Sequence, residues 1–264
     1  MEKINFTKMV ASGNDFVVID GQKVKKSQSY KLLAINICNR KFGAGADGML
    51  VLEKSKVADV RMRIFNSDGS EAEMCGNGAR CAALYIGKKD TKLQTKAGII
   101  QAEVRGDSVK IKLTDPKDTK LGIPVPIDNR TLKANFINTG VPHVVIFVEG
   151  LDEIDVAGLG RKIRNHKKFT PVGTNVNFIE VLSSNSIKIR TYERGVEDET
   201  LACGTGSVAS ALILALSINT GNNVFVHTKS GEILKVHFKK DGAKFSDVWL
   251  QGRAKIVYKG VYNV

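Results

Sequence analysis

Two cysteines introduce nearly the same tetrapeptide in the two halves of the sequence. The first reads Cys75-Gly76-Asn77-Gly78 and the second reads Cys203-Gly204-Thr205-Gly206. Small and apolar residues with helical character follow each, over 79–86 and 207–216, which predicts a cysteine at the N-terminus of a helix in both halves. Backbone amides and the dipole at such a position favour a thiolate and bind anions. The pair is therefore suited to acid and base chemistry.

Two thiols on opposite faces of one carbon atom could invert its configuration. If the halves face each other, an amino acid bound by its α-carboxylate at the two helix ends presents one face of its α-carbon to each thiol. A thiolate removes the α-proton from one face, and a protonated thiol returns a proton to the other. The helix amides stabilise the negative charge that develops on the carboxylate, as an oxyanion hole does. This chemistry requires no cofactor.

The elements that would position these cysteines recur in the same order in both halves. Alternating, strand-like residues precede each cysteine, over 60–65 and 187–192. Thr95-Lys96-Ala97-Gly98 recurs as Thr228-Lys229-Ser230-Gly231, and the segment 13–19 is echoed by 140–146. The repetition predicts two similar domains from an internal duplication. Strands that arrive in runs, with few long helices, favour a mixed or mostly antiparallel α+β fold.

The expected domains are residues 1–120, which carry Cys75, and 121–253, which carry Cys203. The segment 115–128 is rich in proline, glycine and aspartate, and we interpret it as the connection between them. A first helix is predicted over 30–41.

Composition restricts the classes of protein to consider. The chain has 264 residues, 42% of them hydrophobic and 25% charged, which is typical of a globular protein rather than a disordered one. The net charge is +13, but aromatics make up only 6%, which disfavours a nucleic-acid-binding surface. We expect no secretory signal, no membrane span and a cytoplasmic location with reduced cysteines. The histidine and cysteine spacings predict no metal site.

The sequence resembles the diaminopimelate epimerase family over almost its whole length. Two segments separated by four residues match the family signature: Asn66-Ser67-Asp68-Gly69-Ser70 and Cys75-Gly76-Asn77-Gly78-Ala79-Arg80. Four further segments look like family landmarks in the right order: 9–16, 43–48, 192–195 and 202–206. The resemblance implies a cofactor-independent isomerase that interconverts LL- and meso-2,6-diaminopimelate for lysine and cell-wall precursors, with Cys75 and Cys203 as the acid–base pair.

The resemblance also implies roles for other residues. It implies substrate contacts from Asn14, Asn66, Asn175, Glu193 and Arg194, and backbone anchoring by Gly76, Asn77, Gly204 and Thr205. His143 and Glu193 correspond to groups that tune the thiols. The family fold has two pseudo-symmetric domains, each a sheet or barrel wrapped around a central helix, and a last strand near 254–264 that returns to the first domain. The resemblance leaves a homodimer open.

Two positions depart from the family pattern. Gly48 stands where some members have a glutamine that contacts substrate, and Val141 stands where many have an asparagine before Pro-His. Both departures concern the distal end of the substrate rather than the two-cysteine chemistry.

Several other residues are interpreted as structural. Cys38 and Cys81 lie in apolar or helical runs and are expected in the core. The run Gly43-x-Gly45-x-x-Gly48 fits a dinucleotide fingerprint formally, but a helix precedes it and a strand follows it, so we interpret it as a loop. Arg80 is interpreted as an ordinary helix charge outside the site.

Two alternative functions stay open at this stage. A proline or hydroxyproline racemase also uses two facing cysteines, although those enzymes typically carry a histidine where this chain has Asn77. A non-catalytic protein that binds anionic amino acids would use the cysteines only for packing. Incorporation of solvent deuterium at the α-carbon separates an epimerase from a binding protein.

Overall fold

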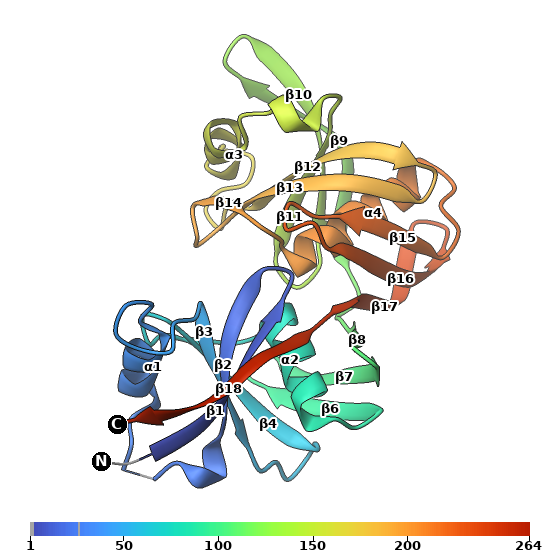
Figure 1. Ribbon diagram of the computed structural model, residues 1–264. Helices are drawn as coiled ribbons and strands as arrows, with labels where there is room; N and C mark the ends of the chain where they lie inside the picture. Colours follow the sequence, from blue (N-terminus) through green and yellow to red (C-terminus); the bar gives the residue numbers. More distant parts are fainter. Residues whose placement is uncertain (1–2, 26) are drawn as a thin grey trace. The chain divides into compact units, whose positions relative to one another are not determined.

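The computed structural model describes residues 3–25 and 27–264 and divides the chain into two compact units. Unit 1 comprises Met1–Lys112 and Gly252–Val264, and unit 2 comprises Leu113–Gln251. Within the described residues, each unit contains two α-helices and one mixed, mostly antiparallel arrangement of strands (Figure 1). The chain is thus an α+β protein dominated by strands, in agreement with the predicted class.

Unit 1 is built from the N-terminal elements and the last strand. Its elements are β1 (Lys3–Ala11), β2 (Asn14–Asp20), the 3-10 helix η1 (Gly21–Lys23), α1 (Tyr30–Cys38), β3 (Gly48–Glu53), β4 (Val60–Asn66), β5 (Glu71–Ala72), α2 (Gly76–Ile86), β6 (Asp90–Thr95), β7 (Gly98–Arg105), β8 (Ser108–Lys112) and β18 (Lys255–Asn263).

The strands of unit 1 pair in the order β18-β1-β2-β3-β4-β6-β7-β8. The pairings β2–β3 and β4–β6 are parallel, and α1 and α2 provide the respective crossovers. The other pairings are antiparallel, and β18 returns to β1 with Lys3 opposite Asn263. The first and the last described strands, β1 and β18, therefore lie side by side in this unit (Figure 1).

Unit 2 is built from the elements between these segments. Its elements are β9 (Lys117–Ile127), β10 (Arg130–Asn138), β11 (Pro142–Phe147), the 3-10 helix η2 (Leu151–Glu153), α3 (Val156–Arg164), β12 (Asn175–Ser183), β13 (Ser186–Glu193), β14 (Asp198–Thr200), α4 (Gly204–Ser217), β15 (Asn223–His227), β16 (Ile233–Asp241) and β17 (Lys244–Arg253), whose last two residues belong to unit 1.

The strands of unit 2 pair in the order β9-β10-β11-β12-β13-β15-β16-β17. Again two pairings are parallel, β11–β12 across α3 and β13–β15 across α4. Parallel neighbours need such a crossover, whereas antiparallel neighbours are joined by turns. Each unit thus follows the same sequence of antiparallel and parallel pairings.

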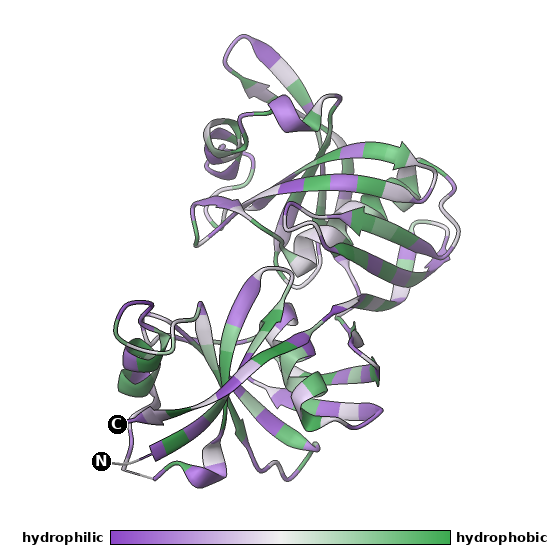
Figure 2. Ribbon diagram, viewed as in Figure 1, coloured by the Kyte–Doolittle hydropathy of each residue, from purple (hydrophilic) through white to green (hydrophobic). Residues whose placement is uncertain are grey.

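One helix in each unit is enclosed by its sheet. Helix α2 contacts strands from β18 and β1 to β7 and β8, and α4 contacts strands from β10 to β16. Residues 206–215 of α4 are all buried, because this helix has strands around it rather than solvent on one side. Along β16 hydrophobic and hydrophilic residues alternate from Leu234 to Lys239, so one face packs on the core (Figure 2).

The other helix of each unit covers the outer face of the sheet. Helix α1 packs on β3 and β4, and α3 packs on β12, β13 and β14. Cys38 lies in the apolar cluster beneath α1, and Cys81 is fully buried in α2, which confirms both as core residues. Burial raises the pKa of Cys38 to about 12, so this thiol is held in its protonated form. No helix in the described ranges is long and apolar enough to cross a bilayer.

Three expectations about these elements were wrong. The first is the end of α1, which stops at Cys38 rather than at residue 41. Asn39 has extended backbone, and its side-chain oxygen accepts from the N–H groups of Lys41 and Phe42. An asparagine that binds neighbouring N–H groups competes with continued helix.

The second is the segment 115–128, which is not a linker: residues 117–127 form β9 and pair with β10. Pro124 and Pro126 are two residues apart, and alternate residues of a strand direct their nitrogens to the same edge. Both rings can therefore sit in β9 without removing a bond to β10. The proline content of the segment led us to predict a linker, but the spacing of the two prolines is compatible with a strand.

The third is Arg80, which is fully buried rather than an exposed helix charge. Its guanidinium donates to Asn77 Oδ1 at 2.6 Å, to Ser12 Oγ at 2.7 Å and to the carbonyl oxygen of Arg253 at 3.2 Å. Strands enclose α2 so that its residues 77–83 are all buried, and these acceptors offset the cost of burying the charge.

Candidate active site

Cys75 is the N-cap residue of α2, which confirms its predicted place at a helix N-terminus. Its Sγ accepts a hydrogen bond from the N–H of Gly78 at 3.4 Å and lies 3.8 Å from Asn14 Oδ1, to which the thiol can donate. The side chain is partly exposed. The structure thus brings together two residues predicted for the site, Cys75 and Asn14.

The residues after Cys75 offer backbone rather than side-chain groups. The side-chain oxygen of Asn77 accepts from Arg80, so its amide is engaged inside the unit. Gly76 and Asn77 form the first turn of α2, where N–H groups have no intrahelical acceptor. These N–H groups and the helix dipole suit a carboxylate ligand. Asn66, at the end of β4, donates to Ser70 Oγ at 2.9 Å and is exposed.

Cys203 is the N-cap residue of α4, again as predicted, and only 8% of it is exposed. Its Sγ lies 3.5 Å from Thr205 Oγ1. Thr139 donates to the carbonyl oxygen of Thr205 at 3.1 Å, and Ser207 donates to that of Cys203 at 2.9 Å. Hydroxyl groups therefore hold the first turn of α4, which contains the predicted residues Gly204 and Thr205.

Asn177 is a buried residue of this region that sequence reasoning missed. Its Nδ2 donates to the carbonyl oxygen of Val144 at 2.9 Å and contacts His143 Nδ1 at 3.1 Å, while its Oδ1 accepts from Thr191 at 3.0 Å. A carbonyl oxygen can only accept, so the amide nitrogen is identified and His143 Nδ1 must be the unprotonated ring nitrogen. The available signal was an asparagine at an inward-facing position of a strand, two residues after Asn175.

His143 is neutral in this environment. The side chain is completely buried, and desolvation, with a smaller contribution from the charge of Arg194, lowers its pKa to about 3. With Nδ1 accepting from Asn177, the ring proton resides on Nε2, which finds no hydrogen-bond partner among the described residues. His143 can therefore donate a hydrogen bond but carries no charge near neutral pH.

A glycine separates this network from the thiol of Cys203. A Cβ atom at Gly206 would lie 2.3 Å from Asn177 Oδ1 and 3.3 Å from Cys203 Sγ, so only glycine fits there without a shift. At Gly78, in the corresponding turn of α2, a Cβ would meet a methyl group of Leu50 at 3.1 Å instead. The two helix N-termini thus rest on different partners, one polar and one apolar.

Asn175 connects β11 to the turn after β13. Its Nδ2 donates to the carbonyl oxygen of Pro142 at 3.1 Å, and its Oδ1 accepts from the N–H of Arg194 at 2.8 Å. The Arg194 guanidinium donates to the carbonyl oxygen of Val172 at 3.0 Å. Burial raises the pKa of Glu193, which is half-buried. Asn175 therefore positions Arg194, an arrangement the sequence did not indicate.

Gly48, one of the two departures from the family pattern, has a steric reason. A Cβ at this position would lie 2.8 Å from the carbonyl oxygen of Phe65 and 3.4 Å from the ring of Phe16. Phe16 and Phe65 occupy the strands on either side of β3, so a larger residue at position 48 would require them to move.

Comparison with known proteins shows which family the chain matches. A family model described as diaminopimelate epimerase matches residues 6–124 and 135–257. The chain is 40% identical to the diaminopimelate epimerase of Caldanaerobacter subterraneus over 99% of this chain and 100% of that one. It is 44% identical to that of Archaeoglobus fulgidus, with 99% and 97% covered, and 42% identical to that of Aquifex aeolicus, with 97% of each covered.

Solved structures share the fold at much lower identity. A phenazine biosynthesis protein of the PhzF family from Bacillus anthracis aligns with a TM-score of 0.75 and 19% identity over 100% of both chains. A hydroxyproline epimerase from Agrobacterium vitis aligns with a TM-score of 0.72 and 14% identity over 99% of this chain and 91% of that one.

Proposed function

Because the chain belongs to the diaminopimelate epimerase family, we propose that it interconverts LL- and meso-2,6-diaminopimelate by proton transfer at one α-carbon. Similarity at this level over nearly the full length of several family members supports the substrate. The observation that carries the chemistry is a cysteine at the N-cap of an enclosed helix in each unit.

In the proposed mechanism Cys75 and Cys203 act on opposite faces of the same α-carbon. One of them, as a thiolate, takes the α-proton, and the other gives its S–H proton to the opposite face, so the number of protons is unchanged and the configuration is inverted. The N–H groups of Gly76, Asn77, Gly204 and Thr205 hold the α-carboxylate and stabilise the charge that moves onto it. Protein groups alone perform the transfer, and no cofactor takes part.

The remaining predicted residues would bind the second amino-acid end of the substrate. Arg194 offers a fork of donors for a carboxylate, and Glu193 offers an acceptor for an ammonium group. Asn14, Asn66 and Asn175 add amide groups. His143, neutral and protonated on Nε2, would tune a thiol as a hydrogen-bond donor rather than as a charge.

We also infer that the two units are the two domains of a duplicated chain. The same sequence of antiparallel and parallel pairings in each unit supports this inference. In unit 1 the strand β18 pairs with β1, and in unit 2 β9 pairs with β10. The last strand would thus complete the first domain as β9 completes the second.

The test is solvent exchange with LL-diaminopimelate in D₂O, followed by loss of the α-proton signal in the NMR spectrum. Wild-type protein should exchange the α-proton and form the meso isomer. Cys75→Ser and Cys203→Ser should each lose about 10²- to 10⁴-fold in turnover, because serine is a much weaker acid. Cys38→Ser and Cys81→Ala, at the buried thiols, should retain turnover in whatever fraction folds.

Other results would overturn the proposal. Exchange of proline and not of diaminopimelate would indicate a racemase of the proline type. Binding of diaminopimelate without exchange would indicate a binding protein. Full turnover in either Cys→Ser variant would exclude the two-thiol mechanism.

A further inference from the structure

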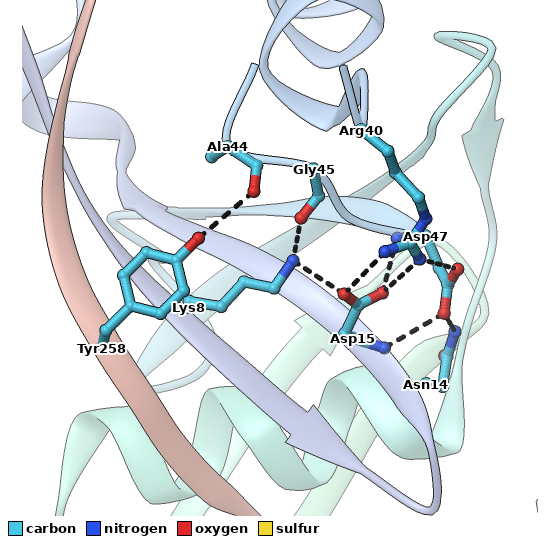
Figure 3. Close-up of polar contacts among 8 residues, drawn as sticks. All are labelled: Lys8, Asn14, Asp15, Arg40, Ala44, Gly45, Asp47 and Tyr258. Atoms are coloured by element: carbon cyan, nitrogen blue, oxygen red, sulfur yellow. Dashed lines mark hydrogen bonds and ion pairs between the residues drawn. The ribbon is translucent and has the colours of Figure 1, made fainter. Parts of the chain in front are cut away.

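A group of charged side chains in unit 1 connects the loop over residues 39–47 to Asn14 (Figure 3). The Oδ1 atom of Asn14 lies 3.8 Å from Cys75 Sγ. Asp15 accepts from Arg40 at 2.9 Å and from Lys8 at 2.7 Å. Arg40 also donates to Asp47 at 2.7 Å. Asp47 in turn accepts from Asn14 Nδ2 at 2.8 Å. Two cations and two anions thus form one connected group that ends at Asn14.

The contact with Asp47 determines which end of the Asn14 amide faces Cys75. The two ends of an asparagine amide are nearly equal in size, so their partners decide the orientation. A carboxylate can only accept, and it therefore binds the NH₂ end of Asn14. The oxygen end is left pointing at the sulfur of Cys75, 3.8 Å away. With the oxygen there, Asn14 can accept a hydrogen bond from the S–H group, whereas the reversed amide would donate one to the sulfur.

Asp47 is itself held from several directions. Its Oδ2 also accepts from the backbone N–H of Asp15 at 3.1 Å, and its own N–H donates to Asp15 Oδ1 at 2.9 Å. Arg40 contacts both carboxylates, so it links the loop to β2. These reciprocal contacts fix the position of the Asp47 carboxylate relative to Asn14.

The far side of the group is anchored in the core. Lys8 is buried and donates to the carbonyl oxygen of Gly45 as well as to Asp15. Burial alone would raise the pKa of Asp15, but hydrogen bonds from Arg40 and Lys8 lower it to about 2, so the carboxylate stays charged. Tyr258 of β18 donates to the carbonyl oxygen of Ala44 at 3.2 Å (Figure 3). The loop is therefore tied to β1, β2 and β18.

We propose that Asp47 is a positioning residue for the reaction, and that it acts by holding the amide oxygen of Asn14 toward Cys75. The proposal rests on the proposed function and adds to it a role for the loop over residues 39–47. Asp47 touches neither the sulfur nor, in this proposal, the substrate. Its effect reaches Cys75 only through Asn14.

The first test compares Asp47→Asn with a matched control. Asp47→Asn keeps the shape but replaces an obligatory acceptor by an amide that can also donate, so Asn14 can turn its NH₂ group to Cys75. We expect kcat/KM for LL-diaminopimelate to fall roughly 10- to 100-fold, a loss typical of misplaced catalytic groups, with little change in Tm. Asp59 also accepts from one lysine side chain and one backbone N–H. Asp59→Asn should leave turnover unchanged.

The second test asks whether Asp47 acts through Asn14. If it does, the double variant Asn14→Ala/Asp47→Asn should be no less active than Asn14→Ala alone, because coupled residues do not give additive losses. In a Cys203→Ser background, Asp47→Asn should also raise the rate at which iodoacetamide alkylates Cys75, measured by peptide mass spectrometry. An NH₂ group facing the sulfur favours the thiolate, which is the reactive form.

Each of three results would overturn the proposal. Asp47→Asn could have the turnover of the wild type, the losses could multiply in Asn14→Ala/Asp47→Asn, or the alkylation rate of Cys75 could be unchanged. Absence of turnover in the wild type would instead refute the proposed function. Should Asp47→Asn melt too low to assay, the exchange Asn14→Asp/Asp47→Asn decides. This double variant again places one amide and one carboxylate side by side at positions 14 and 47. The proposal requires that it be more active than Asn14→Asp alone.

Discussion

At the scale of single residues, hydrogen-bond partners decide how the polar side chains near each cysteine are oriented. Asp47 accepts from the NH₂ end of Asn14, and the carbonyl oxygen of Val144 accepts from the NH₂ end of Asn177. The first contact leaves an oxygen facing Cys75, and the second makes His143 Nδ1 an acceptor. The orientation of each of these asparagines therefore follows from the acceptor that its NH₂ group binds.

The neutral state of His143 predicts a pH dependence of stability. Its pKa in the folded chain, about 3, lies below the ordinary value of about 6.5. Below roughly pH 6.5 the unfolded chain binds a proton at this histidine and the folded chain does not. The free energy of unfolding therefore has its full value above that pH and decreases as the pH falls toward 3. The slope approaches about 1.4 kcal/mol per pH unit.

The measurement is urea denaturation of wild type and His143→Gln between roughly pH 7 and 5. Glutamine does not titrate, so the free energy of unfolding of the variant should depend less steeply on pH. Parallel curves would show that His143 takes up its proton in the folded chain as easily as in the unfolded one.

Arg194 is expected to matter for substrate rather than for folding. Its guanidinium makes one described contact, to the carbonyl oxygen of Val172, and its backbone is held by Asn175. Arg194→Met should reduce kcat/KM for diaminopimelate by an amount equivalent to about 2 to 5 kcal/mol, because a charged contact is lost on binding. The melting temperature should hardly change. Arg130→Met, at an exposed position of β10, serves as the control, and equal kinetics in both variants would remove Arg194 from the site.

At the scale of elements, the two enclosed helices begin alike but rest on different neighbours. Both start at a cysteine N-cap followed by glycines. The third helical residue faces Leu50 in unit 1 and Asn177 in unit 2. A methyl group of leucine can shift by a few tenths of an ångström, whereas Asn177 is held by three hydrogen bonds. The same sequence motif therefore tolerates change differently in the two helices.

This difference predicts unequal effects of two equivalent substitutions. Gly206→Ala should destabilise the chain by about 1 to 3 kcal/mol, as overpacking against a fixed group does. Gly78→Ala should change stability by less than about 1 kcal/mol, because the gain in helix propensity offsets a mild contact with Leu50. Thermal melting of both variants tests the prediction. A larger loss of stability from Gly78→Ala than from Gly206→Ala would contradict the view that Asn177 is fixed and that Leu50 can shift.

At the scale of the whole chain, the last strand completes the first unit. β18 pairs with β1 along its length, Gly260 lies against the ring of Phe6, and Tyr258 makes an edge contact with the same ring. Without β18, β1 would lose one of its two neighbours and Phe6 would be uncovered. Unit 1 therefore depends on a strand that lies far along the sequence from β1.

Deletion of residues 255–264 should lower the Tm by more than about 5 °C, which for a chain of this size corresponds to a loss of a few kcal/mol. Amide hydrogen exchange should accelerate in β1, and much less in α3 and β12. Removal of Val264 alone is the control and should have no effect. A truncated chain that melts like the full one would show that β1 is stable with β2 as its only partner.

Local patterns in the sequence by themselves determined the class of the fold and the place of both cysteines. Alternation predicted the strand before each cysteine, and the small and apolar residues after each cysteine motif predicted α2 and α4, since these signals depend on neighbours within a few residues. The roles of the site residues, including the use of both thiols on one carbon, stay predictions. The sequence also predicted a loop over 43–48; the structure has a loop over 43–47, and Gly48 is the first residue of β3.

Only the tertiary structure decided which partners surround each polar group. Arg80 is buried because a whole sheet encloses α2, residues 117–127 form a strand because β10 is available to pair with them, and Asp47 faces Asn14 because β2 and the loop after α1 meet. These contacts join residues far apart in the chain, and no short pattern encodes them. The orientation of the Asn14 amide depends on its hydrogen-bond partners, and the charge of His143 depends on its burial. Both therefore require the tertiary structure.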